Sequence, residues 1–220
     1  MEETPEMSLS QSLPRGRHSI PREVVLDNQR TRLLDGAGKA LEERGYGDLS
    51  VAQITGQAGV SRATFYVIFE SKRECVLMAQ RRAFERLAAR IGQACAGLDT
   101  WDDKLAAGLG AGLRFAVESP EEARLLILES MGADRLLADS VIAYHGELIE
   151  LLRTGRRICP RAAGLPDVTE RALIGATTSV AADLLMTGKA RELIDLEPQL
   201  LELMSMPYLT SENDFGAGDG

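Results

Sequence analysis

Residues 45–75 read GYGDLSVAQITGQAGVSRATFYVIFESKREC, and this stretch decides the fold. Ser50 precedes a short segment, 51–58, with helical apolar periodicity, and its hydroxyl can cap the first turn of that helix. Gly59 follows where the chain must turn sharply, and a residue without a Cβ tolerates the positive φ of such a turn. Ser61 can cap a second short helix directly after the turn. Two short helices around a tight turn are therefore expected.

The second helix, residues 62–69, spans barely two turns, and a helix this short has almost no stability of its own. We expect Phe65 to hold it by packing against Val51 and Ile54. An upstream helix with an apolar stripe, ending at Gly45, would complete a three-helix core. The opposite face would present Arg62, Ala63, Thr64 and Tyr66. This spacing predicts a helix-turn-helix whose second helix enters a DNA major groove. A three-helix hairpin without a DNA role is the alternative.

The same run resembles the DNA-binding domain of the tetracycline-repressor (TetR) family of bacterial transcription regulators. The resemblance is carried by Gly45, Tyr46, Val51, Ile54, Ala58, Gly59, Val60, Ser61, Thr64, Tyr66, Phe69, Ser71, Lys72 and Glu74. Three positions depart from the family's usual residues: Thr55 replaces an alanine, Ala63 replaces a common glycine, and Val67 takes a position that is often polar or aromatic. The match spans about a quarter of the chain.

The resemblance implies a role for each residue of the DNA-binding set, which is Ser50, Ser61, Arg62, Ala63, Thr64, Tyr66 and Lys72. Ser50 and Lys72 would contact phosphate beside helix N-termini. Thr64 and Tyr66 would bond backbone phosphates, and Arg62 would read a base edge. Small residues such as Ala63 let the helix backbone approach the duplex. Tyr66 could alternatively fill the domain core.

Arg15, Gly16 and Arg17 lie in residues 1–20, which read as a flexible basic arm ahead of the helices. A glycine between two arginines allows an extended backbone to sink into a narrow minor groove. The alternative is an ordinary basic tail without a binding role.

Composition excludes several classes of protein. The chain has 220 residues, a net charge of −8 and three cysteines, Cys75, Cys95 and Cys159. Residues 14–75 carry ten basic and eight acidic side chains, hence +2. Dispersed cysteines argue against a disulfide framework or a zinc site. The sequence offers no apolar segment of about 20 residues for a membrane span and no signal peptide. We expect a cytoplasmic protein without membrane partners, metal or cofactor.

The rest of the chain reads as helical almost throughout, which predicts an all-α protein. We expect a helix-turn-helix domain over 21–75, a helical ligand-binding and dimerisation domain over 76–210, and a flexible tail over 211–220. A long helix over 71–94 would link the domains. Further helices are expected at about 100–118, 120–131, 134–158, 167–188 and 197–206.

The resemblance implies an apolar cavity for a small-molecule effector in the second domain. The candidate lining residues are Trp101, Phe115, Glu129, Met131, Tyr144, His145 and Leu148. Aromatic and methionine residues at helical spacing also suit an ordinary core. Glu129 interrupts an apolar run, so burial would require a partner. Arg114 or a cationic ligand could supply it.

Residues 169–185 are rich in small side chains, and an apolar stretch follows from residue 198. The resemblance implies that two such helices form a four-helix interface in a homodimer, with a buried intrachain helix as the alternative. We therefore expect a repressor that binds a palindromic DNA operator and is released by a small apolar ligand. A ligand-independent regulator or an activator is the alternative. No catalytic motif favours an enzyme.

Overall fold

The computed structural model describes residues 21–127 and 135–209. The predicted arm with Arg15 and Arg17, the predicted tail, and Glu129 and Met131 lie outside these residues. Within them every regular element is a helix, which confirms the all-α fold class. The elements are α1 (Arg22–Asp48), α2 (Val51–Ala58), α3 (Arg62–Ile68), α4 (Lys72–Cys95), α5 (Trp101–Glu118), α6 (Pro120–Ile127), α7 (Arg135–Arg153), α8 (Gly155–Ile158), the 3-10 helix η2 (Pro160–Gly164), α9 (Thr169–Met186), α10 (Glu192–Asp195) and α11 (Glu197–Leu209).

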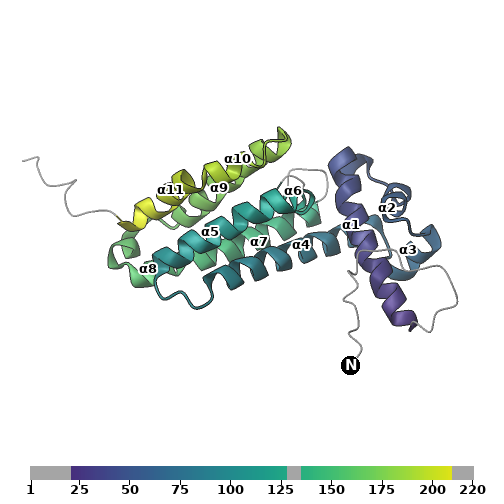
Figure 1. The fold of residues 1–220 in the computed structure, drawn as a ribbon, viewed down its shortest axis with the longest axis horizontal. Coiled ribbons are helices and arrows are strands. Elements are labelled where there is room, and N and C mark those ends of the chain that lie inside the picture. The colour runs from purple at the N-terminus through teal and green to yellow at the C-terminus, as the bar shows by residue number, and fades with distance from the viewer. Residues whose placement is uncertain (1–20, 128–134, 210–220) are drawn as a thin grey trace, which may run out of the picture.

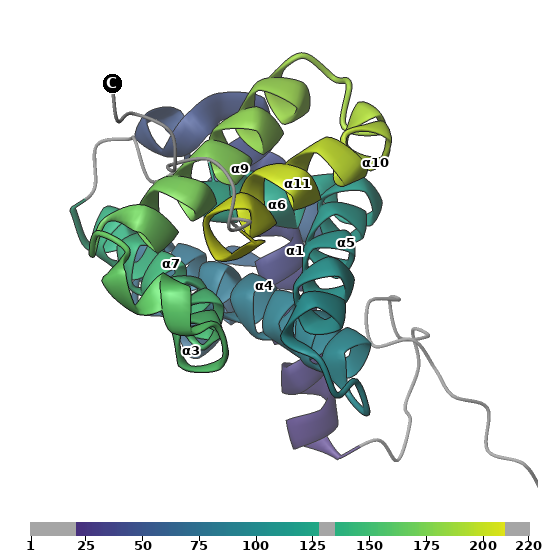
Figure 2. The same ribbon diagram turned by 90° about the vertical axis from the view of Figure 1, so that its left-hand side faces the viewer.

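The molecule is elongated, with α1–α3 at one end and the other helices in a bundle (Figure 1). Helix α4 leaves the first unit and runs along the bundle. Viewed toward the bundle's far end, α9 and α11 lie on the side away from α4 (Figure 2).

The predicted caps of the short helices are confirmed. The hydroxyls of Ser50, Ser61 and Ser71 accept hydrogen bonds from backbone N–H groups in the first turns of α2, α3 and α4. Gly59 has φ 60° and ψ 37°, the left-handed conformation that the turn requires. Gly45 also has positive φ, 69°, and breaks the regular helix of α1 near its end. Local signals in the sequence therefore set where these helices begin and end.

Helices α1 and α2 cross with almost no space at Gly36. A Cβ added there would lie 2.8 Å from the carbonyl oxygen of Ile54 and 2.9 Å from the backbone nitrogen of Ala58. Arg32, one turn earlier, donates to the carbonyls of Ala58 and Gly59 at 2.6 and 3.0 Å, and so satisfies the C-terminal end of α2. These contacts hold the turn against α1.

The second domain departs from the predicted helix bounds in two ways. The helix expected over 134–158 divides at Thr154 into α7 and α8. The next residue, Gly155, lies against the indole of Trp101: a Cβ there would come within 2.5 Å of the ring. The described part of the helix expected over 120–131 ends at Ile127. The four-residue helix α10 was not predicted.

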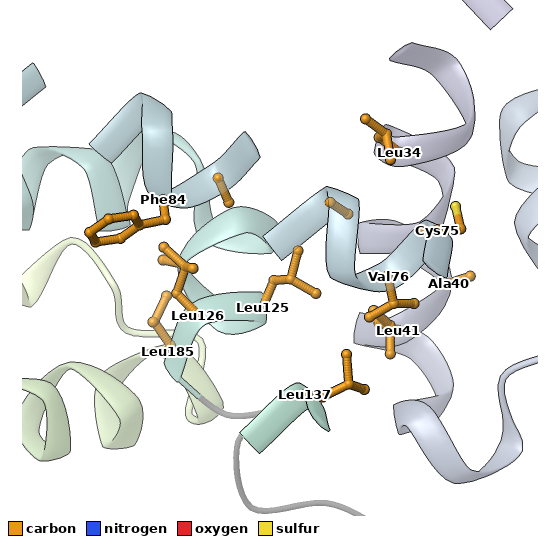
Figure 3. Close-up of a cluster of buried hydrophobic side chains, with 14 of the residues drawn as sticks. Leu34, Ala40, Leu41, Cys75, Val76, Phe84, Leu125, Leu126, Leu137 and Leu185 are labelled. Carbon is orange, nitrogen blue, oxygen red and sulfur yellow. The ribbon is translucent and has the colours of Figure 1, made fainter. Parts of the chain in front are cut away.

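One hydrophobic core spans the helix-turn-helix and the adjoining part of the bundle, and a second, smaller cluster around Trp101 lies at the far end of the bundle. Figure 3 shows Val76 of α4 beside Leu41 of α1 and Leu137 of α7. Farther along α4, Phe84 lies beside Leu126 of α6. The predicted boundary at residue 75 falls inside α4 and inside this core. The two functional regions are therefore packed as one body.

The Gly36 crossing yields a stability prediction. Gly36→Ala should lower the free energy of unfolding by about 1–3 kcal/mol because the added methyl meets fixed backbone. Gly38→Ala is the matched control, since its Cβ meets nothing within 4 Å, and it should be neutral or stabilising by up to about 1 kcal/mol. Urea denaturation of both variants checks this. Equal effects would contradict the close crossing.

Candidate nucleic-acid interface and ligand cavity

Helix α3 presents a continuous exposed face. Arg62, Ala63, Tyr66 and Val67 are exposed, whereas Phe65 is fully buried against the core. Tyr66 is 52% exposed and only its ring edge contacts Phe65, with the ring centroids 5.4 Å apart. The alternative that Tyr66 fills the core therefore fails. An exposed guanidinium and an exposed phenol on one short helix can donate hydrogen bonds to an anionic partner.

The predicted serines lie at helix starts beside this face. The hydroxyls of Ser61 and Thr64 are 2.9 Å apart, and Thr64 is half-buried. The backbone N–H and the hydroxyl of Ser50 both donate to the side-chain oxygen of Gln53, and the hydroxyl accepts from the Gln53 backbone N–H, so the pair forms a capping box. The free N–H groups of a helix's first turn attract anions, which suits phosphate.

Lys72 has a structural task that sequence reasoning missed. Its ammonium donates to the carbonyls of Tyr46 and Leu49 at 3.2 and 2.7 Å and lies 4.7 Å from the centre of the Tyr46 ring. It thereby ties the start of α4 to the segment between α1 and α2. An ammonium has three donors, so one hydrogen remains for a phosphate.

Ion pairs connect the helix-turn-helix to the second domain. Arg82 on α4 donates to Asp35 of α1 at 2.5 Å. Arg124 on α6 pairs with Glu42 of α1 and also donates to the carbonyl of Leu185, in the last turn of α9, at 2.5 Å. The partners stand 47 to 82 residues apart, so no local sequence signal could have found them.

The second domain contains an apolar cavity of about 240 Å³ between α4, α5, α6, α7, α9 and α11. Five of the seven predicted lining residues line it: Trp101, Phe115, Tyr144, His145 and Leu148. The other two, Glu129 and Met131, lie outside the described residues. Lys104 is the one charged side chain among the described lining residues. The cavity therefore suits a ligand with an extensive hydrocarbon surface.

Two neighbouring polar residues of α7, Tyr144 and His145, line the cavity. The Tyr144 ring stacks on Phe84, with centroids 4.4 Å apart. His145 is half-buried, and loss of solvation lowers the pKa of its imidazole below the ordinary value of 6.5. The imidazole is therefore neutral at pH 7, when it can donate one hydrogen bond and accept another.

A buried ionic network lies beside Trp101, a residue of the cavity wall. Glu170 is fully buried and accepts two hydrogen bonds from Arg156, at 2.5 and 2.7 Å, and one from the Tyr208 hydroxyl at 3.1 Å. The Arg156 guanidinium holds the pKa of Glu170 below its usual value. Tyr208 in turn packs on the Trp101 ring. This network fixes α8, α9 and α11 around the indole.

Arg114 points to α11. Its guanidinium lies 3.8 Å from the Glu197 carboxylate and is 51% exposed. Arg114 therefore has a partner of its own on the surface, and the suggested buried pair with Glu129 lies outside what the structure describes.

The outward face of α9 is rich in small side chains, and that of α11 mixes apolar and polar residues. Ala172, Gly175, Ala176 and Ser179 are exposed on α9, and Met206 on α11 is 54% exposed. Small side chains allow a facing helix to approach closely.

No helix within the described residues is long and apolar enough to cross a membrane. No group of three or more His, Cys, Asp or Glu side chains in the same part of the chain could hold a metal ion.

The comparisons agree with this geometry. Residues 33–79 match the family model described as bacterial regulatory proteins, tetR family. The solved structure of the fatty acid degradation regulator FadR from Bacillus halodurans is 20% identical, with a TM-score of 0.71, and covers 80% of this chain and 94% of its own. FadR from Bacillus subtilis, solved in complex with stearoyl-CoA, is 21% identical, with a TM-score of 0.65, and covers 79% of this chain and 96% of its own. A TetR transcriptional regulator from Chloroflexus aurantiacus is 25% identical, with a TM-score of 0.63, and covers 82% of this chain and 96% of its own. No curated protein sequence matches the chain.

The lowered pKa of the half-buried His145 imidazole predicts that the stability of the fold depends on pH. Because the pKa of this imidazole is lower in the folded than in the unfolded state, the unfolded state binds more protons below pH 6.5. The free energy of unfolding should therefore fall more steeply between pH 7.5 and 5.5 for the parent than for His145→Gln. Urea denaturation at the two pH values measures this. Parallel losses in both proteins would contradict the assignment.

Proposed function

Because the chain belongs to the TetR family of bacterial transcriptional regulators, which bind DNA and are not enzymes, we propose that it is a repressor. It binds a palindromic operator as a homodimer and leaves it when a small apolar ligand fills the cavity. The observation that carries the proposal is the outer face of α3, where Arg62 and Tyr66 are exposed while Phe65 anchors the helix from below.

On the operator, each α3 enters a major groove. Arg62 reads a base edge, Ala63 permits close approach of the backbone, and Tyr66 bonds a phosphate. Ser50, Ser61, Thr64 and Lys72 contact the phosphates around the groove. The arm places Arg15 and Arg17 in the adjacent minor groove. The support for this arrangement is that the described members of the set lie on α3 or at the helix starts beside it.

The homodimer pairs α9 and α11 of one chain with the same helices of a second copy. The exposed small residues of α9 permit close helix contact, and exposed Met186 and Met206 supply apolar surface that a partner would cover. A two-fold dimer also matches the symmetry of a palindromic operator, whose half-sites it reads one helical turn apart or a multiple of it.

The ligand enters the cavity and acts on the DNA-binding end through α6. Ala123, Leu126 and Ile127 line the cavity, while Arg124 of the same helix pairs with Glu42 of α1. A ligand that displaces α6 therefore changes a contact to the helix-turn-helix. A coupling of about 1–3 kcal/mol is enough for typical induction. Activation, or regulation without a ligand, is the alternative and uses the same DNA surface.

Selection of DNA from a random pool tests the proposal and should yield a symmetric site. On that site, Arg62→Ala should weaken binding by about tenfold or more, since a bidentate base contact contributes about 1–3 kcal/mol. Tyr66→Phe should weaken binding about fivefold through loss of one hydrogen bond. The control is Arg157→Ala, an exposed arginine on α8. Fluorescence anisotropy measures all three.

Both tested side chains are exposed, so the variants should fold normally by circular dichroism. Unchanged binding by folded Arg62→Ala and Tyr66→Phe would show that α3 does not face DNA. A site without internal symmetry would contradict the homodimer.

The Arg124–Glu42 pair predicts long-range coupling. Glu42→Gln should weaken operator binding about fivefold, because the unliganded arrangement of the two domains loses the ion pair between Arg124 and Glu42. Glu43→Gln makes the same charge change at a residue that bonds Gln57 within the helix-turn-helix, and binding should stay within twofold of the parent. If the two variants bind equally, the pair does not couple the domains.

A further inference from the structure

Most polar groups of the cavity already have partners inside the protein. The hydroxyls of Thr154, Thr177 and Thr178 each donate to a backbone carbonyl of the preceding turn, at 2.7, 3.0 and 2.9 Å. The Tyr144 ring stacks on Phe84, and loss of solvation raises the pKa of its phenol. The threonine hydroxyls have used their single donor inside the protein and can only accept from a ligand.

His145 differs from them. Its imidazole lines the cavity and is half-buried, and no hydrogen-bond partner for it occurs within residues 21–127 and 135–209. A half-buried polar group without a partner loses solvation and gains nothing in return. A ligand that brings a hydrogen-bonding group to this point recovers that loss.

The charge around the cavity is small. Lys104 is the charged side chain among the described lining residues, and it is exposed. Recognition of phosphate groups uses clustered arginine and lysine side chains. The described rim has no such cluster, so a coenzyme A head group with its phosphates finds no site here.

The cavity is also long. Its lining runs along α4 from Phe84 to Cys95 and along α5 from Trp101 to Ala116. At a rise of about 1.5 Å per residue, the shorter of these walls extends about 16 Å. An extended hydrocarbon chain fits this shape better than a compact polycyclic molecule.

We propose that the ligand is an uncharged amphiphile: an extended hydrocarbon chain that bears one hydroxyl or carbonyl group, hydrogen-bonded to the imidazole of His145. The proposal rests on the ligand-responsive function above and narrows it to a chemical class. A carboxylate at the same point would lose its hydration beside a neutral imidazole, and Lys104, the cationic residue among the described lining residues, is exposed. The body of the ligand would lie between α4 and α5.

The chain contains its own reporter for a test. Trp101 is its one tryptophan and lines the cavity, so ligand entry changes the intrinsic fluorescence. The full-length protein is titrated without DNA with dodecan-1-ol, dodecanoate, dodecanoyl-CoA and dodecane. The alcohol should bind at least tenfold more tightly than the carboxylate and the CoA ester.

Two variants locate the interaction. His145→Leu should weaken dodecan-1-ol about five- to tenfold, the value of one hydrogen bond, and leave dodecane unchanged. Gly112 lines the cavity and its Cβ would meet nothing within 4 Å, so Gly112→Leu should fill the space and weaken every probe. The control is Gly92→Leu, at an exposed glycine of α4 with equally open surroundings.

Three results would overturn the proposal: tightest binding of dodecanoyl-CoA or of dodecanoate, equal binding of the alcohol by parent and His145→Leu, or no binding of any probe by folded protein. None of them touches operator binding, which is measured separately with Arg62→Ala. Failure of the ligand class and failure of the regulator proposal are therefore distinguishable.

Discussion

Helix α4 is buried in two places along its length, and the rest of the structure depends on this. Near its start, Val76 and Ala79 pack in the core that also holds α1. Two turns later Phe84 faces the cavity. Close-packed interiors do not deform continuously, so a shift at Phe84 must be accommodated at Val76. The helix-turn-helix is thus packed against the structure that would respond to a ligand.

The helix-turn-helix was largely predictable because its signals are local. Ser50, Gly59 and Ser61 each act within a few residues of their own position, as caps or as a turn. What could not be read from the sequence was how α2 is held against α1. Gly36 and Arg32 stand more than 20 residues before the backbone groups that they contact. Helical periodicity indicates which face is buried, and it does not indicate against which segment.

The same limit applied to the second domain. The family resemblance implied a cavity, and Trp101, Tyr144 and His145 do line one. The resemblance and the residue spacing were not enough to assign partners: Arg114 lies by Glu197 of α11, and buried Glu170 binds Arg156 of α8. Next to Thr154, where the predicted helix divides, Gly155 lies against the distant Trp101 ring, which leaves no room for a Cβ. Each of these is a tertiary contact between distant segments, and the sequence does not indicate which distant segments will meet.

The location of the cavity walls has an evolutionary consequence. Leu105 and Leu109 on α5 and Leu148 on α7 line the cavity, whereas the α3 face and the ties from Arg82 and Arg124 to α1 lie on other elements. Substitutions at these leucines can reshape the space without changing the residues proposed to read DNA or to transmit the response. After gene duplication, the copies of such a regulator can diverge in what they detect while continuing to recognise the same promoter.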